Sequence, residues 1–179
     1  MNVLGIDPGL TKPGFYTGGT AYSYDMKDLD QFEALAYLDE WVEHMLMELA
    51  KAGEDILVAC ENPVKPRFGS GVKTLLAQGA VRLTTKRVAM TRIHVPVRWV
   101  DIPPSSLKKF ATGSGNASKA EVLWAAKKVG ALVTTEDEAD ADWCWRIGQL
   151  YTEEPGAVVD IGALGIRDVT TVMPELQEV

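Results

Sequence analysis

The sequence predicts an α/β protein built on a five-stranded mixed sheet, a three-stranded antiparallel meander plus two parallel strands, flanked by helices. Three observations predict this class. An apolar strand and a hairpin pattern open the chain, apolar residues then recur with the period of a helix, and a continuous apolar run follows at residues 55–61. A strand, a helix and a second strand in this order give parallel neighbours in one sheet. The 179 residues suit one domain and are too few for two lobes around a cleft.

The opening meander is predicted by alternation. Residues 3–6 form a short apolar strand. The stretch GFYTGGTAYSYD then alternates aromatic and polar residues on both sides of Gly18-Gly19, which is typical of a two-residue hairpin.

A helix and a buried strand come next. Apolar residues recur on one helical face from Phe32 to Leu49, Asp30 and Glu33 have the spacing of a capping box, and the helix is expected to end near Gly53. The run DILVACE is apolar on both faces, as in a parallel sheet, and it stops at Glu61.

The rest of the chain continues this alternation and gives the predicted order βββαβαβαα. Residues 1–155 are interpreted as one domain and residues 156–179 as a C-terminal extension in which the sequence defines no element. The elements expected after residue 61 are a helix over 70–90, a strand over 93–100, a helix that follows a capping box formed by Ser118 and Glu121, and a final helix over 134–151.

Composition excludes several classes of protein. There is no run of eighteen apolar residues and no cationic-then-apolar leader, so we expect a cytoplasmic protein with no membrane contact. Cys60 and Cys144 both lie among apolar residues, which indicates reduced core thiols and excludes a Cys/His metal cluster.

The charges are unevenly spread. The net charge is -7, yet residues 62–119 carry eleven lysines and arginines and one acidic residue, Asp101. A block of one sign is often only a solvated face of a helix. Its length here favours a second interpretation, a surface that binds a phosphate backbone.

Two carboxylates follow neighbouring strands. Asp7 ends the first strand and Glu61 ends the fourth, so in a parallel pair both would lie at one edge of the sheet. Two buried like charges force one group to take a proton unless a divalent cation lies between them. Oxygen ligands of this kind suit Mg²⁺. The sequence therefore predicts a metal site at this edge.

The last predicted helix offers further ligands. Asp137 and Asp140 are three residues apart, hence on one helical face, and Asp142 is an alternative if the register differs. Acids at this position also simply favour a helix N-terminus. If they converge with Asp7 and Glu61, four carboxylates can hold two Mg²⁺ about 3.5–4 Å apart, the arrangement that hydrolyses phosphodiesters.

Four segments together resemble the RuvC-type Holliday junction resolvases, a family with a ribonuclease H-like fold. GIDPG, with Asp7, is similar to the family's first motif, Glu61 after ILVAC occupies the place of the second acid, LKKFATGSGNASKAEV is similar to the basic segment, and DEADA is similar to the last motif. The resemblance covers residues 1–150.

The resemblance implies a homodimer that nicks two opposing strands of a four-way DNA junction with Mg²⁺ or Mn²⁺. It assigns the catalytic and metal-binding roles to Asp7, Glu61, Asp137 and Asp140, and places Lys119 near the scissile phosphate. The residues expected to contact DNA are Lys65, Arg67, Phe68, Lys73, Arg82, Lys108, Lys109 and Lys119.

Departures from the family pattern indicate a phage or otherwise outlying member. The aromatic residue that many members place soon after the second acid is absent, because Val64 stands there, so Phe68 is the candidate wedge at the crossover. A loop aromatic packed on its own domain is the equal alternative. Trp124, Trp143 and Trp145 lie among apolar residues on predicted helices, which favours core or dimer packing over base stacking.

Other functions fit less well. A phosphotransferase of the actin and sugar-kinase type needs two lobes and a second Gly-rich phosphate loop, which are absent here. A non-cleaving protein that binds branched DNA would not need all four acids. A related nuclease acting on other branched or replication-fork DNA has the same chemistry and stays open.

Overall fold

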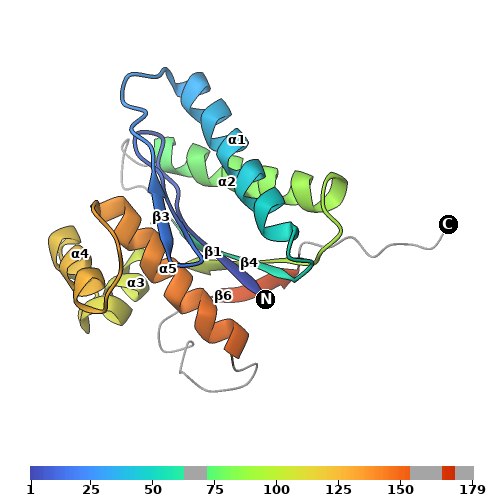
Figure 1. Ribbon diagram of the computed structural model, residues 1–179. Coiled ribbons are helices and arrows are strands. Elements are labelled where there is room, and N and C mark those ends of the chain that lie inside the picture. The colour runs from blue at the N-terminus through green and yellow to red at the C-terminus, as the bar shows by residue number, and fades with distance from the viewer. Residues whose placement is uncertain (63–71, 154–166, 172–179) are drawn as a thin grey trace.

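The computed structural model describes residues 1–62, 72–153 and 167–171, which form a mixed sheet with helices on both faces (Figure 1). The strand order is β3-β2-β1-β4-β5-β6. In chain order the elements are β1 (Asn2–Asp7), β2 (Gly14–Thr17), β3 (Thr20–Ser23), α1 (Gln31–Ala50), β4 (Ile56–Glu61), α2 (Val72–Thr91), β5 (Val97–Ile102), α3 (Pro104–Thr112), α4 (Lys119–Lys128), α5 (Glu136–Glu153) and β6 (Arg167–Thr171).

The predicted five-stranded sheet is confirmed. β1 and β2 are antiparallel, as are β2 and β3, whereas β1 is parallel to β4 and β4 to β5. Thr17 pairs with Thr20 across a hairpin in which Gly18 and Gly19 have φ angles of 56° and 85°, the two positive values that a type I′ turn requires. Both predicted capping boxes, Asp30 with Glu33 and Ser118 with Glu121, are also present.

Three features differ from the prediction. A helix that was not predicted, α3, begins at Pro104 directly after Pro103 and ends at Thr112, with Gly113 as its C-cap at a φ of 83°. The fifth strand begins at Val97, since the residues before it form the turn that leaves α2. A sixth strand, β6, pairs antiparallel with β5 and comes from the extension to which the sequence assigned no element.

The helices form one layer on each side of the sheet. α1 and α2 cover one face, and α5 covers the other with α3 and α4 outside it (Figure 1). Strand residues therefore alternate between two cores, with Leu4 and Val58 buried beneath α1 and Val3 and Leu57 buried beneath α5. Cys60 and Cys144 are buried free thiols, as expected. No helix in the described segments is long and apolar enough to span a bilayer.

Trp124 lies outside the core, so of the two packings expected for it only a dimer contact stays open. Trp143 is packed in the core, where its indole nitrogen donates to the Val122 carbonyl at 3.2 Å. The Trp124 side chain is 64% exposed, because Val122 and Ala126 occupy the buried side of α4.

Glycines allow α5 to pack closely on β1 and β2. A Cβ atom added at Gly5 would lie 2.1 Å from the Ala141 carbonyl oxygen, and one added at Gly14 would lie 2.0 Å from that of Asp137. Further along α5, a Cβ at Gly148 would lie 2.6 Å from a methyl of Val3. The helix backbone thus rests almost directly on the strands, and this fixes how far each α5 side chain stands from the sheet.

We expect Gly5→Ala to lower the free energy of unfolding by about 2–3 kcal/mol, because the added methyl meets a backbone atom that cannot rotate away. Chemical denaturation measures the loss. Ala36→Gly, at an exposed position of α1, is the reference variant. Its free energy of unfolding should fall by about 1 kcal/mol, because glycine has a lower helix propensity than alanine. Equal losses in the two variants would contradict the close-packing account.

Candidate metal-binding active site

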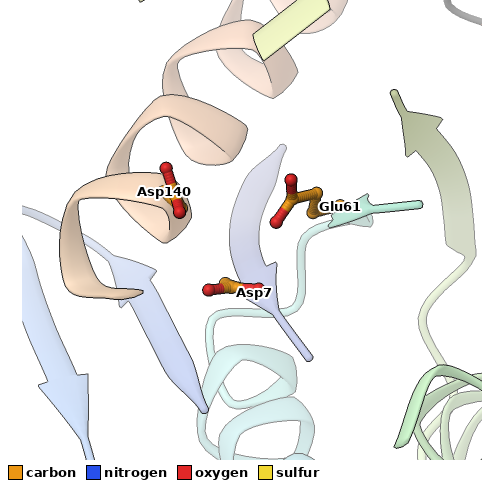
Figure 2. Close-up of side chains that lie close together, drawn as sticks. All are labelled: Asp7, Glu61 and Asp140. Carbon is orange, nitrogen blue, oxygen red and sulfur yellow. The ribbon is translucent and has the colours of Figure 1, made fainter. Parts of the chain in front are cut away.

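Three carboxylates from three elements converge at one edge of the sheet (Figure 2). Asp7 ends β1, Glu61 ends β4 and Asp140 lies near the start of α5. One oxygen of each carboxylate lies within 4.8 Å of the other two. The parallel pairing of Ile6 with Cys60 sets Asp7 and Glu61 at the same level, as their positions in the sequence predict.

Burial and mutual repulsion both disfavour three negative charges here. Burial, and then the charges of Glu61 and Asp140, raise the pKa of Asp7 well above its usual range. Burial also raises the pKa of Glu61. Burial together with the Glu61 charge raises the pKa of Asp140 to about 7. The cluster of three carboxylates therefore needs a positive charge nearby to stay ionised.

Lys119 supplies part of that charge from the first residue of α4. Its Nζ lies 3.2 Å from a carboxylate oxygen of Asp137 and 3.5 Å from one of Asp140. Burial lowers the pKa of Lys119, but the carboxylates of Asp7, Asp140 and Asp137 raise it by more, so the ammonium stays charged. One cation facing several acids leaves the site short of neutrality.

The donor set fits a hard divalent cation. All three clustered groups offer carboxylate oxygens, and their raised pKa values are the response expected when like charges meet in a buried place without a counter-ion. Asp7, Glu61 and Asp140 are the residues that would hold such an ion.

Comparison with known proteins gives related sequences and folds, although no family model matches the chain. The crossover junction endodeoxyribonuclease RuvC of Nocardia farcinica is 32% identical over an alignment of 164 residues that covers 82% of this chain and 82% of the relative. The same-named protein of Synechococcus sp. WH7803 is 31% identical over 150 residues, covering 79% of this chain and 93% of the relative.

The chain belongs to the RuvC family. A solved structure of Thermus thermophilus RuvC superposes with a TM-score of 0.62 at 21% identity, covering 85% of this chain and 95% of that one. A second, of T. thermophilus RuvC in complex with Holliday junction substrate, gives a TM-score of 0.61 at 20% identity and covers 85% and 94%. The ribonuclease H-like fold expected from the RuvC resemblance is therefore confirmed, and RuvC membership implies use of a divalent metal ion.

The two other acids suggested by the sequence, Asp137 and Asp142, are not among the three grouped carboxylates of the described residues. The Asp137 carboxylate contacts Lys119, and its role as a ligand stays a prediction. Asp142 is fully buried and accepts from Nε of Arg146 at 2.8 Å. The cluster thus contains Asp140 rather than Asp142, the register that the RuvC resemblance favoured.

Glu138 is a supporting residue that the RuvC resemblance did not assign. Its carboxylate accepts from Ser23 Oγ at 2.7 Å and from the backbone N–H and the hydroxyl of Thr134 at 2.7 and 2.8 Å. Burial raises the pKa of Glu138, but these hydrogen bonds lower it by more, to below its usual range. The contacts tie the start of α5 to β3. The signal for this role was the capping-box spacing of Thr135 and Glu138, whose backbone N–H donates to the threonine hydroxyl.

Gln78 is a second residue that sequence reasoning missed. Its side-chain nitrogen donates to the Asn62 side chain at 3.0 Å and lies 3.5 Å from the Glu61 carbonyl oxygen, so it supports the end of β4 from α2. Nothing in the sequence marks it, because the contact joins residues that only the folded helix brings together.

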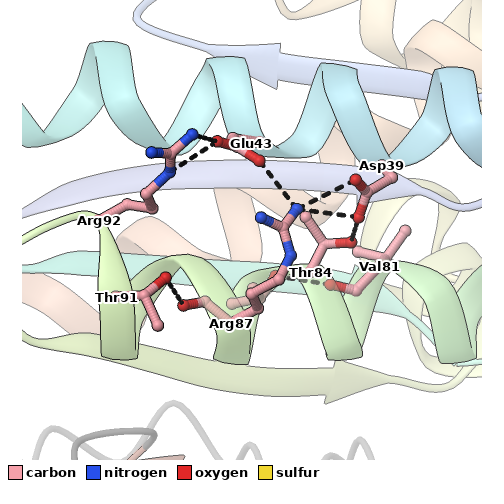
Figure 3. A network of polar contacts seen from close by, with 8 residues as sticks. Asp39, Glu43, Val81, Thr84, Arg87, Thr91 and Arg92 are labelled. Carbon is pink, nitrogen blue, oxygen red and sulfur yellow. Dashed lines mark hydrogen bonds and ion pairs between the residues drawn. The ribbon is translucent and has the colours of Figure 1, made fainter.

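The basic block of the sequence divides into two parts in space. On α2, Arg87 pairs with Asp39 and Glu43 at 3.0 and 2.8 Å, and Arg92 pairs with Glu43 at 3.1 Å (Figure 3). Arg82 pairs with Asp101 and lies over the Trp99 ring. These arginines attach α2 to α1 and β5, so the alternative of an ordinary charged face accounts for much of α2.

The structure divides the residues predicted to contact DNA into three groups. Arg82 is already paired in the protein alone. Within the described part of the chain, no ion-pair partner is found for Lys73, Lys108 or Lys109. The Lys108 charge partly offsets the rise in the pKa of Glu61 that burial causes. Lys65, Arg67 and Phe68 lie outside the described residues. Their roles on DNA all stay predictions.

Without a cation, the protein should lose stability as pH rises toward neutrality. The pKa of Asp140 is 3.8 when unperturbed and about 7 in the fold, so folding favours the protonated carboxyl. The contribution of the Asp140 carboxyl to the free energy of unfolding is therefore fully present below about pH 4 and is lost as pH rises through about 7. The asparagine of Asp140→Asn cannot ionise. In EDTA at pH 8 the free energy of unfolding of this variant should therefore exceed that of wild type by about 1–2 kcal/mol.

Thermal melting at pH 5 and pH 8, with EDTA or Mg²⁺, checks this expectation. Asp28→Asn, on the exposed loop before α1, is the matched control and should follow wild type. An Asp140→Asn protein no more stable than wild type at pH 8 in EDTA would refute the charge-repulsion account.

Proposed function

We propose that this protein is a cytoplasmic, structure-selective endonuclease of a bacterial cell or a phage-infected host that resolves four-way DNA junctions by paired symmetric nicks. The observation that carries the proposal is the convergence of Asp7, Glu61 and Asp140 with Lys119 at the sheet edge of a RuvC-family fold. Buried carboxylates gathered in this way suit metal-dependent hydrolysis of a phosphodiester bond.

The protein residues have separable tasks in this chemistry. Asp7, Glu61 and Asp140, with Asp137 as a fourth ligand, would hold two Mg²⁺ ions, for which Mn²⁺ substitutes, and the ions when bound would activate water and stabilise the leaving oxygen. Lys119 stays charged beside the acids, so it is placed to neutralise a phosphate oxygen. The lysines of α3 and α4 would position the DNA arms without reading sequence.

A homodimer would match the two-fold symmetry of a junction cut on opposing strands. The exposed face of α2 supports this assembly. Leu76, Leu83 and Met90 recur at seven-residue intervals and are 38%, 70% and 52% exposed. An apolar row with this spacing suits packing against a second helix.

The function is tested by incubating purified protein with a synthetic four-way junction, a replication fork and a linear duplex, each with Mg²⁺ or EDTA. We expect paired nicks at symmetric positions in the junction with Mg²⁺ and no cleavage with EDTA. Cleavage of the fork alone would assign the protein to the related fork nucleases, and binding without cleavage would make it a branched-DNA binding protein.

Removing one metal ligand should abolish cleavage and spare binding. We expect Asp7→Asn, Glu61→Gln and Asp140→Asn each to lower the nicking rate by at least about a thousandfold, because the cation site is lost while the basic surface remains. Rates come from junction cleavage and affinities from gel shift in EDTA. Asp28→Asn is the control, and persistent cleavage by Asp7→Asn would reject the assigned site.

Lys119→Ala should slow turnover more than it weakens binding. Loss of the ammonium next to Asp140 removes positive charge where negative charge develops in the transition state, which is worth about a hundredfold in rate. Lys51→Ala, at the far end of α1, removes an equivalent charge away from the site. Equal losses of rate and affinity in Lys119→Ala would show that the residue binds DNA without assisting the chemical step.

A further inference from the structure

A groove on the outer side of α4 has no part in the site described above. It lies between the end of α3 and α4 and encloses about 520 Å³, within the range of about 300–1,000 Å³ typical of ligand sites. Its walls are formed by Ala111, Thr112, Glu121, Trp124, Ala125, Lys128 and Val129.

Trp124 is the prominent side chain of this groove. It is 64% exposed, and it is the one tryptophan of the five that is not buried or half-buried. Lys128, one helical turn further on, places its Nζ 5.1 Å from the centre of the Trp124 ring. An indole left in water forgoes a large apolar burial, so this arrangement offers a flat aromatic surface and a cation to something outside the chain.

The charge around the groove indicates an anionic occupant. Residues 103–133 carry five lysines and one acid, Glu121, in a protein whose net charge is -7. The Glu121 carboxylate accepts from the backbone N–H and the hydroxyl of Ser118 at 2.7 and 2.8 Å, so its charge is engaged at the start of α4. Lys127 and Lys128 lie in the last turn of α4, and Lys128 lines the groove.

The helix that lines the groove also contacts the acidic site. Lys119, the first residue of α4, contacts Asp137 and Asp140, and Trp124 follows five residues later. Five residues of helix rise about 7.5 Å and turn about 140°, so Trp124 lies on a different side of α4 from Lys119. α4 and α3 lie side by side beyond α5 (Figure 1).

We propose that this groove binds a nucleotide of the DNA substrate, with Trp124 stacked on its base and Lys128 near its phosphate. This inference rests on the proposed function, since it takes DNA as the substrate. Bases close to a crossover are the ones that can leave the stack, and aromatic side chains hold such bases without regard to sequence.

The test measures the affinity of the full-length protein for a fluorescent four-way junction in EDTA, where no cleavage occurs. Trp124→Ala should weaken binding about tenfold, and Trp124→Phe, which keeps a ring, should stay within about threefold of wild type. Lys128→Gln should lower the slope of log affinity against log salt concentration by about one. Leu132→Ala, at an exposed apolar position outside the groove, is the matched control and should bind as wild type does.

Two further measurements keep the outcome interpretable. Junction should quench the indole fluorescence of wild type, and most of that quenching should be lost in Trp124→Phe. Sedimentation of each variant reports its assembly. A Trp124→Ala protein that binds junction as tightly as wild type overturns the inference, and so does a change of assembly with affinity unchanged, which would make the groove a protein contact.

Failure of the proposed function gives a different result. A wild-type protein that binds the junction without cutting it removes the nuclease assignment but leaves the Trp124 comparison decisive. A wild-type protein that binds no junction, fork or duplex overturns both.

Discussion

The close approach of α5 to the sheet is the constraint on which the site depends. Gly5 and Gly14 present no side chain to the carbonyl oxygens of Ala141 and Asp137, so the helix backbone settles against β1 and β2. Only at this depth does a short aspartate on α5, Asp140, reach the carboxylates of Asp7 and Glu61. Glu138 holds the start of the helix to β3 and fixes the rotation that aims Asp140 inward.

The same packing makes the site costly for the fold. Three carboxylates are held together in a partly buried place with one lysine, and their raised pKa values reflect burial and mutual repulsion. Catalytic sites commonly concentrate charge of one sign in this way at the expense of stability. The surrounding core, with Leu4, Ile6 and Cys60 fully buried beside the strand ends, supplies the rigidity that keeps the acids in place.

The two faces of the sheet divide the basic residues between structure and substrate. Beneath α1, the arginines of α2 are paired with Asp39, Glu43 and Asp101 and attach one helix to its neighbours. Beyond α5, Lys119 contacts the acids of the site and Lys128 lines the Trp124 groove. A chain of net negative charge can thus present a local cationic surface, because a phosphate backbone responds to the nearby field rather than to the total.

The sequence by itself determined the antiparallel meander and its parallel neighbour β4, both capping boxes, the Gly18-Gly19 turn and the placement of Asp7 beside Glu61. Each depends on local periodicity or on the geometry of parallel strands. It did not reveal α3, because the two prolines at its start are also typical of a loop, or β6, because its partner strand is far away in the chain. Tertiary structure alone decided that the arginines of α2 are paired and that Trp124 stays exposed. Those outcomes depend on how deeply and at what rotation each helix packs, and that is fixed by contacts between residues far apart in the chain.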